Sequence, residues 1–284
     1  MTAVEQIRAA RPIDTFRDRV TGITEAEFRR RCNGQNIWHS VDLGDLWIEG
    51  ARKNSEVLAH ESKLFRWPDV QGKTVLDIGA FGGFFSFEAE RRGAASVTAI
   101  DYHSWAVDWP ALHEWYAAER QAGRIPDAYN PPAYLIDETN QPGRRPLDVT
   151  RELLGSKVQT VLAKFEDFES EPFDLTLFLG VLYHCQDPMG ALRKVASLTK
   201  DHLIVETHGI YVPGHEDKAY WEYFGDDSVN ADVTTWWAPN DKGLADMLKA
   251  VGFSRVEIVS GGFTLPEAAK NEALHVRIWA HAWK

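Results

Sequence analysis

The sequence predicts an α/β protein with a mostly parallel, seven-stranded sheet that helices cover on both faces. Short apolar runs such as Thr74–Ile78 recur along the chain and end at glycines or acids, which is typical of buried parallel strands. Stretches with helical periodicity, such as Phe84–Arg92 before Gly93, lie between these runs, and this alternation favours parallel strands joined by helices. The expected strands are 74–78, 97–100, 158–162, 174–179, 202–206, 255–259 and 274–280, and the expected helices include 84–92, 188–198 and 241–251.

The alternation begins near residue 71, which divides the chain. We predict an N-terminal helical lid segment over residues 1–70 and a sheet domain over residues 71–284. Insertions near 119–147, rich in proline, and near 211–240, rich in aromatic residues, follow strand ends on the side where open α/β sheets bind ligands. We interpret both as cap segments over an active site, and plain surface insertions are the alternative.

Charge and cysteine content limit the classes of partner. The 284 residues carry a formal net charge of −11, which disfavours nonspecific binding to nucleic acid because that binding needs a basic face. Cys32 and Cys185 show no paired spacing, and His202, His208 and His215 share no ligand spacing, so we expect no metal site. The sequence contains no signal peptide and no run of about 18 apolar residues, which predicts a cytoplasmic protein without a membrane span.

The strongest local signal is the glycine-rich segment Asp77–Gly83 between an expected strand and an expected helix. The backbone must turn tightly there and approach a ligand closely, and Gly79 keeps side chains away from that approach. Asp77 ends the strand, where its carboxylate could receive a ligand amino group. Asp101 ends the next strand and could accept two ribose hydroxyls, although a turn or helix-capping role is the alternative.

A third element, Phe165-Glu166-Asp167, follows the third expected strand. Phe165 could pack on an adenine ring, and a backbone N–H or an acid nearby could meet its exocyclic amine. Taken alone, this segment is an ordinary acidic turn. It indicates an adenine site only in combination with Asp77–Gly83 and Asp101.

Together with Gly180-Val181-Leu182-Tyr183-His184, these motifs resemble a Rossmann-like class I S-adenosylmethionine-dependent methyltransferase, and more narrowly the branch related to the tRNA wobble-uridine carboxymethyltransferases. The similarity covers roughly residues 71–253. Phe81 stands where the family loop usually has a glycine, so the turn must accept a side chain there. The resemblance implies S-adenosylmethionine as cofactor, with contacts from Gly79, Asp101, Tyr102, Phe165, Glu166 and Leu179.

The same resemblance bears on the group that is transferred. In the carboxymethyltransferases a tyrosine and an arginine hold the extra carboxylate of carboxy-S-adenosylmethionine, and Tyr183 and Arg277 are matched to them. The family's upstream tryptophan-arginine-lysine run is missing, and Ile37–Ser40 and Leu46–Glu49 occupy that region. A carboxylate held by one fewer cation would bind less tightly by about 1 to 3 kcal/mol. We therefore expect transfer of an ordinary methyl group.

A hydroxyl acceptor would require a base, and several side chains at expected strand ends qualify. His184 is the first choice because of its place in the motif, and His103, Glu206 and His208 are further candidates. For each of them a structural role is the alternative. Trp236 or Trp237 of the second cap segment would contact the acceptor, or else pack on the N-terminal helices.

Three functions remain open on the sequence. The first is O-methylation of a small molecule, as in natural-product or sugar tailoring. The second is carboxymethylation of the tRNA wobble uridine, and the third is a non-catalytic protein that binds the cofactor. The acidic charge and the aromatic cap favour the first, and the sequence leaves the oligomeric state open.

Overall fold

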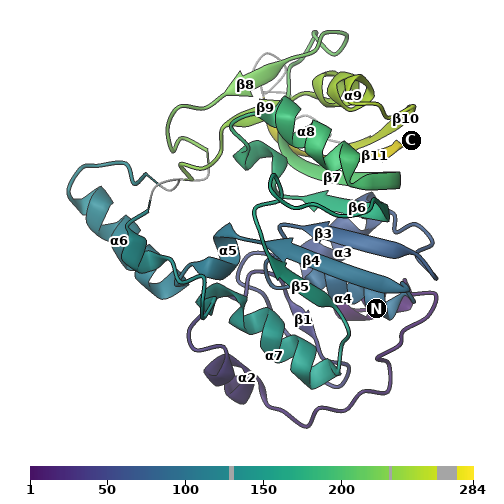
Figure 1. Cartoon of the computed structure of the whole chain (residues 1–284), viewed down its shortest axis with the longest axis vertical. Coiled ribbons are helices and arrows are strands. Elements are labelled where there is room, and N and C mark those ends of the chain that lie inside the picture. The colour runs from purple at the N-terminus through teal and green to yellow at the C-terminus, as the bar shows by residue number, and fades with distance from the viewer. Residues whose placement is uncertain (128–130, 230–231, 261–273) are drawn as a thin grey trace. The chain divides into compact units, whose positions relative to one another are not determined.

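The computed structural model describes residues 1–127, 131–229, 232–260 and 274–284, and Figure 1 shows its ribbon. It divides into two compact units. The first comprises residues 1–126 and 131–164, and the second comprises residues 165–284 together with Asp127. None of the helices in the described residues is both long enough and apolar enough to cross a membrane.

The first unit contains the N-terminal segment and three strands of the main sheet. Its helices are α1 (Ala3–Ala9), α2 (Glu25–Arg31), α3 (Ser55–Phe65), α4 (Phe84–Arg91), α5 (His103–Ala106), α6 (Trp109–Gln121) and α7 (Arg145–Leu154), with 3-10 turns η1 (Ala133–Leu135) and η2 (Pro142–Arg144). Its strands are β1 (Val41–Asp42), β2 (Trp47–Ile48), β3 (Thr74–Ile78), β4 (Ser96–Asp101) and β5 (Gln159–Leu162). The segment expected to be helical thus also contains the short hairpin β1–β2.

The second unit contains the rest of the sheet and one of the expected cap segments. Its strands are β6 (Phe173–Leu179), β7 (Thr199–Tyr211), β8 (Trp221–Tyr223), β9 (Trp237–Pro239), β10 (Arg255–Ser260) and β11 (Leu274–Trp283). Its helices are α8 (Pro188–Ser197) and α9 (Asp241–Ala250), with the 3-10 turn η3 (Leu182–His184). The segment near 211–240 contains the antiparallel pair β8–β9.

The main sheet has seven strands in the order β10-β11-β7-β6-β3-β4-β5. Strand β4 runs parallel to β3 and β5, and β6 runs parallel to β7, whereas β11 is antiparallel to both β7 and β10. The predicted fold class, a mostly parallel seven-stranded sheet with helices, is therefore confirmed.

Helix capping explains several of the observed boundaries. Asp187 accepts the N–H of Gly190 at 2.8 Å at the start of α8, and Pro188 occupies its first turn. Asn240 accepts the N–H of Gly243 at 2.8 Å and so begins α9. These caps lie within one residue of the starts that the sequence predicts.

One expected strand differs clearly from the structure. Strand β7 does not end at Glu206 but continues to Tyr211, because it pairs with β11 from His202 to Tyr211. The prediction that Glu206 and His208 lie at a strand end was wrong, since both lie inside β7. The additional residues of β7 reach the β8–β9 segment. Ile210 of β7 forms a small core there with Phe224, Val229 and Ala238.

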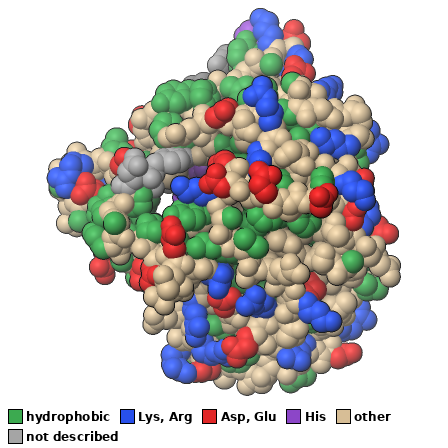
Figure 2. All heavy atoms as spheres, in the orientation of Figure 1, with side chains coloured by type: hydrophobic (Ala, Val, Ile, Leu, Met, Phe, Trp, Pro, Cys, Tyr) green, Lys and Arg blue, Asp and Glu red, His purple; other side chains and the backbone are tan. Residues whose placement is uncertain are grey.

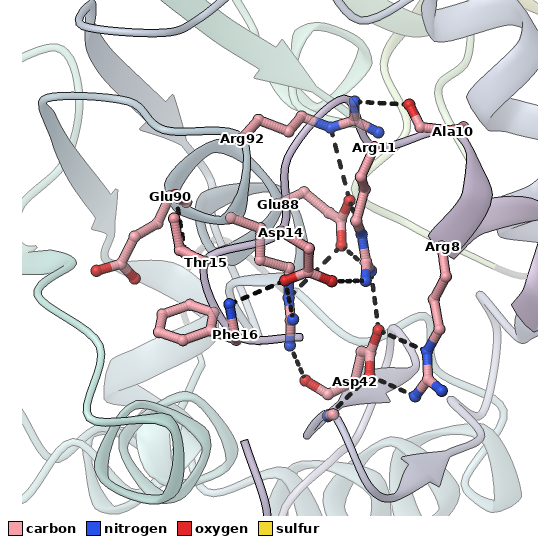
Figure 3. A network of polar contacts seen from close by, with 12 residues as sticks. Arg8, Ala10, Arg11, Asp14, Thr15, Phe16, Asp42, Glu88, Glu90 and Arg92 are labelled. Atoms are coloured by element: carbon pink, nitrogen blue, oxygen red, sulfur yellow. Dashed lines mark hydrogen bonds and ion pairs between the residues drawn. The ribbon is translucent and has the colours of Figure 1, made fainter. Parts of the chain in front are cut away.

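A buried ionic network joins the N-terminal segment to α4. Figure 3 shows the Arg11 side chain reaching three carboxylates, those of Asp14, Asp42 and Glu88. Arg91 also binds Asp14, at 2.9 Å. Because every carboxylate here meets at least one guanidinium, the network ties residues 11–42 to the helix that follows the glycine-rich segment.

Candidate functional site

The glycine-rich turn between β3 and α4 requires left-handed backbone at three positions. Gly79 has φ +73°, Phe81 has φ +49° and Gly83 has φ +78°. A side chain on Gly83 would be strained by this φ and would also crowd Leu147, whose Cδ1 would lie 2.9 Å from the Cβ. The space around Gly82 is open, because a Cβ there would have no neighbouring atom within 4 Å. The turn therefore exposes backbone at Gly82 as the sequence predicts for a ligand-binding loop.

Phe81 occupies the position where the family loop usually has a glycine. Its ring lies between Trp38 and Trp109, with centroids 5.6 and 5.1 Å away. Its carbonyl accepts a hydrogen bond from Trp105 Nε1 at 2.7 Å. The turn thus accommodates the side chain, as expected, because three tryptophans stabilise a conformation that a non-glycine residue rarely adopts.

Asp77, at the end of β3, is buried and has an unusually basic carboxylate. Its Oδ2 accepts a hydrogen bond from Ser86 Oγ at 2.6 Å. Burial, with a contribution from the charge of Asp101, raises the pKa of Asp77 to about 6. The carboxylate is therefore poorly stabilised within the protein itself.

Asp101, at the end of β4, connects the turn to α5. Its carboxylate accepts hydrogen bonds from the N–H and Oγ of Ser104, at 2.9 and 2.6 Å, and from the N–H of Phe81 at 3.1 Å. Burial raises its pKa. Asp101 thus has the local turn role that was the alternative prediction, and its ribose role stays a prediction. Beside it, Tyr102 donates to Glu138 at 2.5 Å.

Among the described residues, neither Asp77 nor Asp101 forms an ion pair with a lysine or an arginine. The charge of His103 lowers the pKa of Asp101, but burial outweighs it. Two buried carboxylates whose hydrogen bonds come from serine and backbone groups fit a ligand that brings a positive amino group and hydroxyl donors. This is the donor set that the amino acid and ribose parts of S-adenosylmethionine present.

The other expected cofactor contacts lie in the second unit. Phe165 is buried, with its ring 5.3 Å from that of Phe178 in an edge-on arrangement. Glu166 is exposed, and Leu179 is the half-buried last residue of β6. Their contacts with a cofactor stay predictions.

Tyr183 and Arg277 are close together, as the resemblance implies. Arg277 Nη2 lies 3.5 Å from the Tyr183 hydroxyl, and its guanidinium carbon lies 5.0 Å from the ring centroid. Arg277 Nε also lies 3.0 Å from the buried Glu206 Oε1, an ion pair without hydrogen-bond geometry. Arg277 therefore already faces a carboxylate of its own chain.

His184, the first choice for a base, is fixed by the cap segment. Its Nδ1 lies 2.9 Å from the carbonyl oxygen of Thr234 and 2.7 Å from Thr234 Oγ1. The neighbouring Tyr183 carbonyl accepts the N–H of Trp236 at 2.8 Å, and the Gln186 carbonyl accepts Trp237 Nε1 at 3.2 Å. Three adjacent contacts thus fasten residues 234–237 to the turn that carries Tyr183.

His208 belongs to a second, separate pair. Its Nε2 lies 2.8 Å from Nδ1 of His275, and Phe224 packs beside both rings. Burial and the nearby charge of Arg277 lower the pKa of His208 to about 4. Sequence reasoning missed His275, although the alternation His275-Val276-Arg277 places it on the same strand face as Arg277.

No group of three His, Cys, Asp or Glu that could hold a metal ion occurs among the described residues. Cys32 and Cys185 are free and buried, and burial raises the pKa of Cys32 to about 12. The charges of Arg145, Arg29 and Arg31 act in the opposite direction on Cys32, but burial outweighs them. Both thiols therefore lack the partly exposed surroundings of a nucleophile.

A family model described as a methyltransferase domain matches residues 51–258. The chain belongs to this methyltransferase family. The methyltransferase class and its cofactor, S-adenosylmethionine, which the sequence motifs predicted, are thereby confirmed.

Among curated relatives, the chain is similar to the tRNA U34 carboxymethyltransferases of Desulfotalea psychrophila and Pseudomonas putida. The first is 25% identical over 82% of this chain and 62% of the relative, and the second is 23% identical over 87% of this chain and 66% of the relative. The chain thus spans less than two thirds of the length of these relatives.

Two solved structures share the fold. The N-terminal domain of EvdMO1, determined in the presence of SAH and D-fucose, has a TM-score of 0.52 and 14% identity, covering 92% of this chain and 97% of that one. A phosphoethanolamine N-methyltransferase of Haemonchus contortus has a TM-score of 0.51 and 14% identity, covering 96% of this chain and 61% of that one.

Proposed function

We propose that the protein transfers a methyl group from S-adenosylmethionine to a hydroxyl group of a small molecule, as in natural-product or sugar tailoring. The observation that carries the proposal is the cluster formed by Tyr183, His184 and His208 in the second unit. The Tyr183 ring centroid lies 4.0 Å from that of His184 and 6.2 Å from that of His208. Two histidines next to aromatic side chains suit a hydroxyl acceptor, which must lose its proton.

The cofactor, when bound, supplies a methyl group that is already activated by the positive sulfur. We assign the carboxylates of Asp77 and Asp101 to its amino and ribose groups. The full set of proposed contacts is Asp77, Gly79, Asp101, Tyr102, Phe165, Glu166 and Leu179. The chain's own tasks are to bind the cofactor, to orient the acceptor and to accept its proton.

The acceptor side is proposed to include His208, Arg277 and the cap residue Trp237. Trp237 is half-buried, and its ring centroid lies 5.1 Å from that of Tyr223. If Trp237 lines the acceptor pocket, Trp237→Ala should raise the KM for the acceptor and leave cofactor affinity and Tm nearly unchanged. If the variant instead melts much earlier and its folded fraction has normal acceptor kinetics, Trp237 has no pocket role. The fully buried Trp105 provides the matched control, because Trp105→Ala should lower stability by about 3 to 5 kcal/mol.

The second candidate is carboxymethyl transfer to tRNA. The contact between Tyr183 and Arg277 favours it, as do the names of the curated relatives. Against it, a carboxylate on the cofactor would compete with Glu206 for Arg277, and the chain lacks the upstream tryptophan-arginine-lysine run. On the face shown in Figure 2, acidic and basic side chains are interspersed, and the formal net charge is −11.

Two measurements separate these candidates. Competition between S-adenosylmethionine and its carboxylated form should favour the ordinary cofactor, and a clear preference for the carboxylated form would reverse the ranking. Binding of tRNA that weakens steeply with salt would also support the second candidate.

The methyl transfer itself can be assayed by formation of S-adenosylhomocysteine with catechol and a series of monosaccharides that includes D-fucose. Turnover with one of these hydroxyl compounds supports the proposal. Tight cofactor binding without turnover across the panel favours a non-catalytic cofactor-binding protein instead.

A further inference from the structure

Two cross-strand pairs lie side by side on one face of β7 and β11. In the antiparallel register Arg277 is opposite His208, and His275 is opposite Ile210. Glu206 and Arg277 are therefore diagonal neighbours, and so are His208 and His275, because side chains two residues apart share a face. The first pair is the ion pair described above, and the second is a histidine–histidine hydrogen bond of 2.8 Å.

The surroundings of His275 favour one direction of that hydrogen bond. Its Nε2 lies 3.9 Å from Oε2 of Glu222, a buried oxygen that has no hydrogen bond in the described structure. A carboxylate at that distance favours a proton on Nε2 of His275, which leaves its Nδ1 as an acceptor. His208 must then donate through Nε2, and its own Nδ1 is unprotonated.

Nδ1 of His208 is the acceptor that this arrangement leaves on the ring. Within the described residues no hydrogen bond ends on it, and His208 is 7% exposed. The rings of Tyr183 and Phe224 each lie 6.2 Å from the His208 ring, centroid to centroid. His184 differs, because its Nδ1 already contacts Thr234. His208 therefore presents a lone pair beside the residues assigned to the acceptor side.

We infer that His208 takes the proton of the acceptor hydroxyl at Nδ1, with His275 and Glu222 as positioning residues that relay a proton outward. This inference rests on the proposed methyl transfer to a hydroxyl. His184 then serves to fasten the cap segment, through Thr234, rather than to accept the proton.

The proton count balances, because one proton enters His208 at Nδ1 and one leaves His275 at Nε2, and the two rings then carry their protons on Nδ1. As the acceptor oxygen forms its new bond to carbon, its proton moves to His208 Nδ1. His208 Nε2–H then passes a proton to His275 Nδ1, and His275 Nε2–H releases one toward Glu222 and solvent, since His275 and Glu222 are 42% and 40% exposed. After the product leaves, solvent restores the starting tautomers by protonating His275 Nε2, as His275 Nδ1–H returns a proton to His208 Nε2 and His208 Nδ1–H is released. The relay matters because burial next to Arg277 makes a charged His208 unfavourable.

The same two strands carry a matched control pair. His202 and His281 are diagonal neighbours in the same register, and their Nε2 and Nδ1 atoms lie 3.0 Å apart. They pack against Trp283 at the other end of β7. His281→Gln therefore changes an equivalent pair that the inference assigns no role.

The tautomers provide a test that needs no acceptor. Proton-coupled ¹⁵N spectra of the full chain, with signals assigned through His208→Gln and His275→Gln, report which nitrogen carries the proton at neutral pH. We expect both His208 and His275 as Nε2–H tautomers, and His275→Gln should alter the ¹⁵N shifts of His208 while His281→Gln does not. A His208 ring protonated on Nδ1 overturns the inference.

Kinetics provide the second test, with the hydroxyl panel and cofactor affinity measured in parallel. His208→Gln should lower kcat by about 10²-fold or more without changing cofactor affinity, because general-base catalysis is lost. His275→Gln should lower kcat less, and His281→Gln should leave it unchanged. If the wild-type protein methylates none of the panel, the proposed function fails, and the assignment of His208 as the base fails with it. If the wild type is active and His208→Gln is equally active, only the present inference fails.

Discussion

Two groups of buried carboxylates in the first unit differ in their partners. Asp77 and Asp101 accept hydrogen bonds from serine side chains and backbone N–H groups. Asp42 and Glu88, by contrast, are surrounded by guanidinium groups, foremost that of Arg11. Both groups are similarly buried, so burial alone does not separate the carboxylates that we propose as cofactor contacts from those that stabilise the fold.

The pKa values of Asp77 and Asp101 are shifted in the opposite direction from that of Asp42. Burial raises the pKa of Asp77 and of Asp101, and no arginine or lysine offsets it. Burial would also raise the pKa of Asp42, but the hydrogen bond from Arg8 and the charges of Arg91 and Arg11 hold that pKa below its usual value. The structural carboxylates are thus paired with arginines, whereas the two carboxylates that we propose as cofactor contacts have no arginine or lysine partner in the described structure.

Breaking the arginine-paired group should have the largest effect on stability. Arg11 is fully buried and contacts three carboxylates, so Arg11→Met would leave buried charges without their partner. We expect a loss of about 3 to 5 kcal/mol in the free energy of unfolding, measured by urea titration. The exposed pair of Arg30 and Glu27 supplies the control, and Arg30→Met should leave stability nearly unchanged. Equal stability of both variants would contradict the structural role of the network.

Asp42→Asn should destabilise the protein at neutral pH by about 1.5 to 3 kcal/mol, since hydrogen bonds to a charged group are lost. The lowered pKa of Asp42 fixes the sign of the pH dependence. Its contribution is present above the unfolded pKa and disappears as pH falls through the folded pKa. Urea titrations from pH 7 downward should therefore show the stability difference between variant and wild type shrinking in acid.

Asp77→Asn should do the opposite and stabilise the cofactor-free protein. The pKa of Asp77 rises from 3.8 unfolded to about 6 folded, so the ionised carboxylate lowers stability above pH 6. That cost disappears as pH falls between those two values, because the folded state binds the proton first. We expect a gain of about 1 to 2 kcal/mol at pH 7, since asparagine remains a buried polar group, and no gain at pH 4. Thermal melts at both pH values measure it, and a destabilised variant at pH 7 would mean that Asp77 is structural.

Local patterns predicted the parts of this site that depend on local physics. The apolar run of β3, the glycines of the turn and the acids at the ends of β3 and β4 are contiguous signals, and the structure has each of them in place. The sequence likewise predicted that Phe81 must be accommodated, although not that Trp38 and Trp109 do so.

Long-range pairing accounts for what the sequence could not predict. Strand β7 was expected to end at Glu206, and the pairing with β11 extends it to Tyr211. The bond between His208 and His275 spans 67 residues, and the one between Arg11 and Glu88 spans 77. No periodicity within a segment reports such partners, so a pair becomes visible only when the strands are in register.

The central claim is that buried carboxylates without an arginine or lysine partner mark the cofactor site, and calorimetric titration tests it most directly. S-adenosylmethionine and S-adenosylhomocysteine would be titrated into the wild-type protein, Asp77→Asn, Asp101→Ala and the control Asp42→Asn, with Tm measured for each to confirm folding. We predict that affinity falls about 10- to 100-fold in the Asp77 and Asp101 variants, since a charge-assisted contact is lost, and stays unchanged in the Asp42 variant. Unchanged affinity in folded Asp77→Asn and Asp101→Ala would contradict the account.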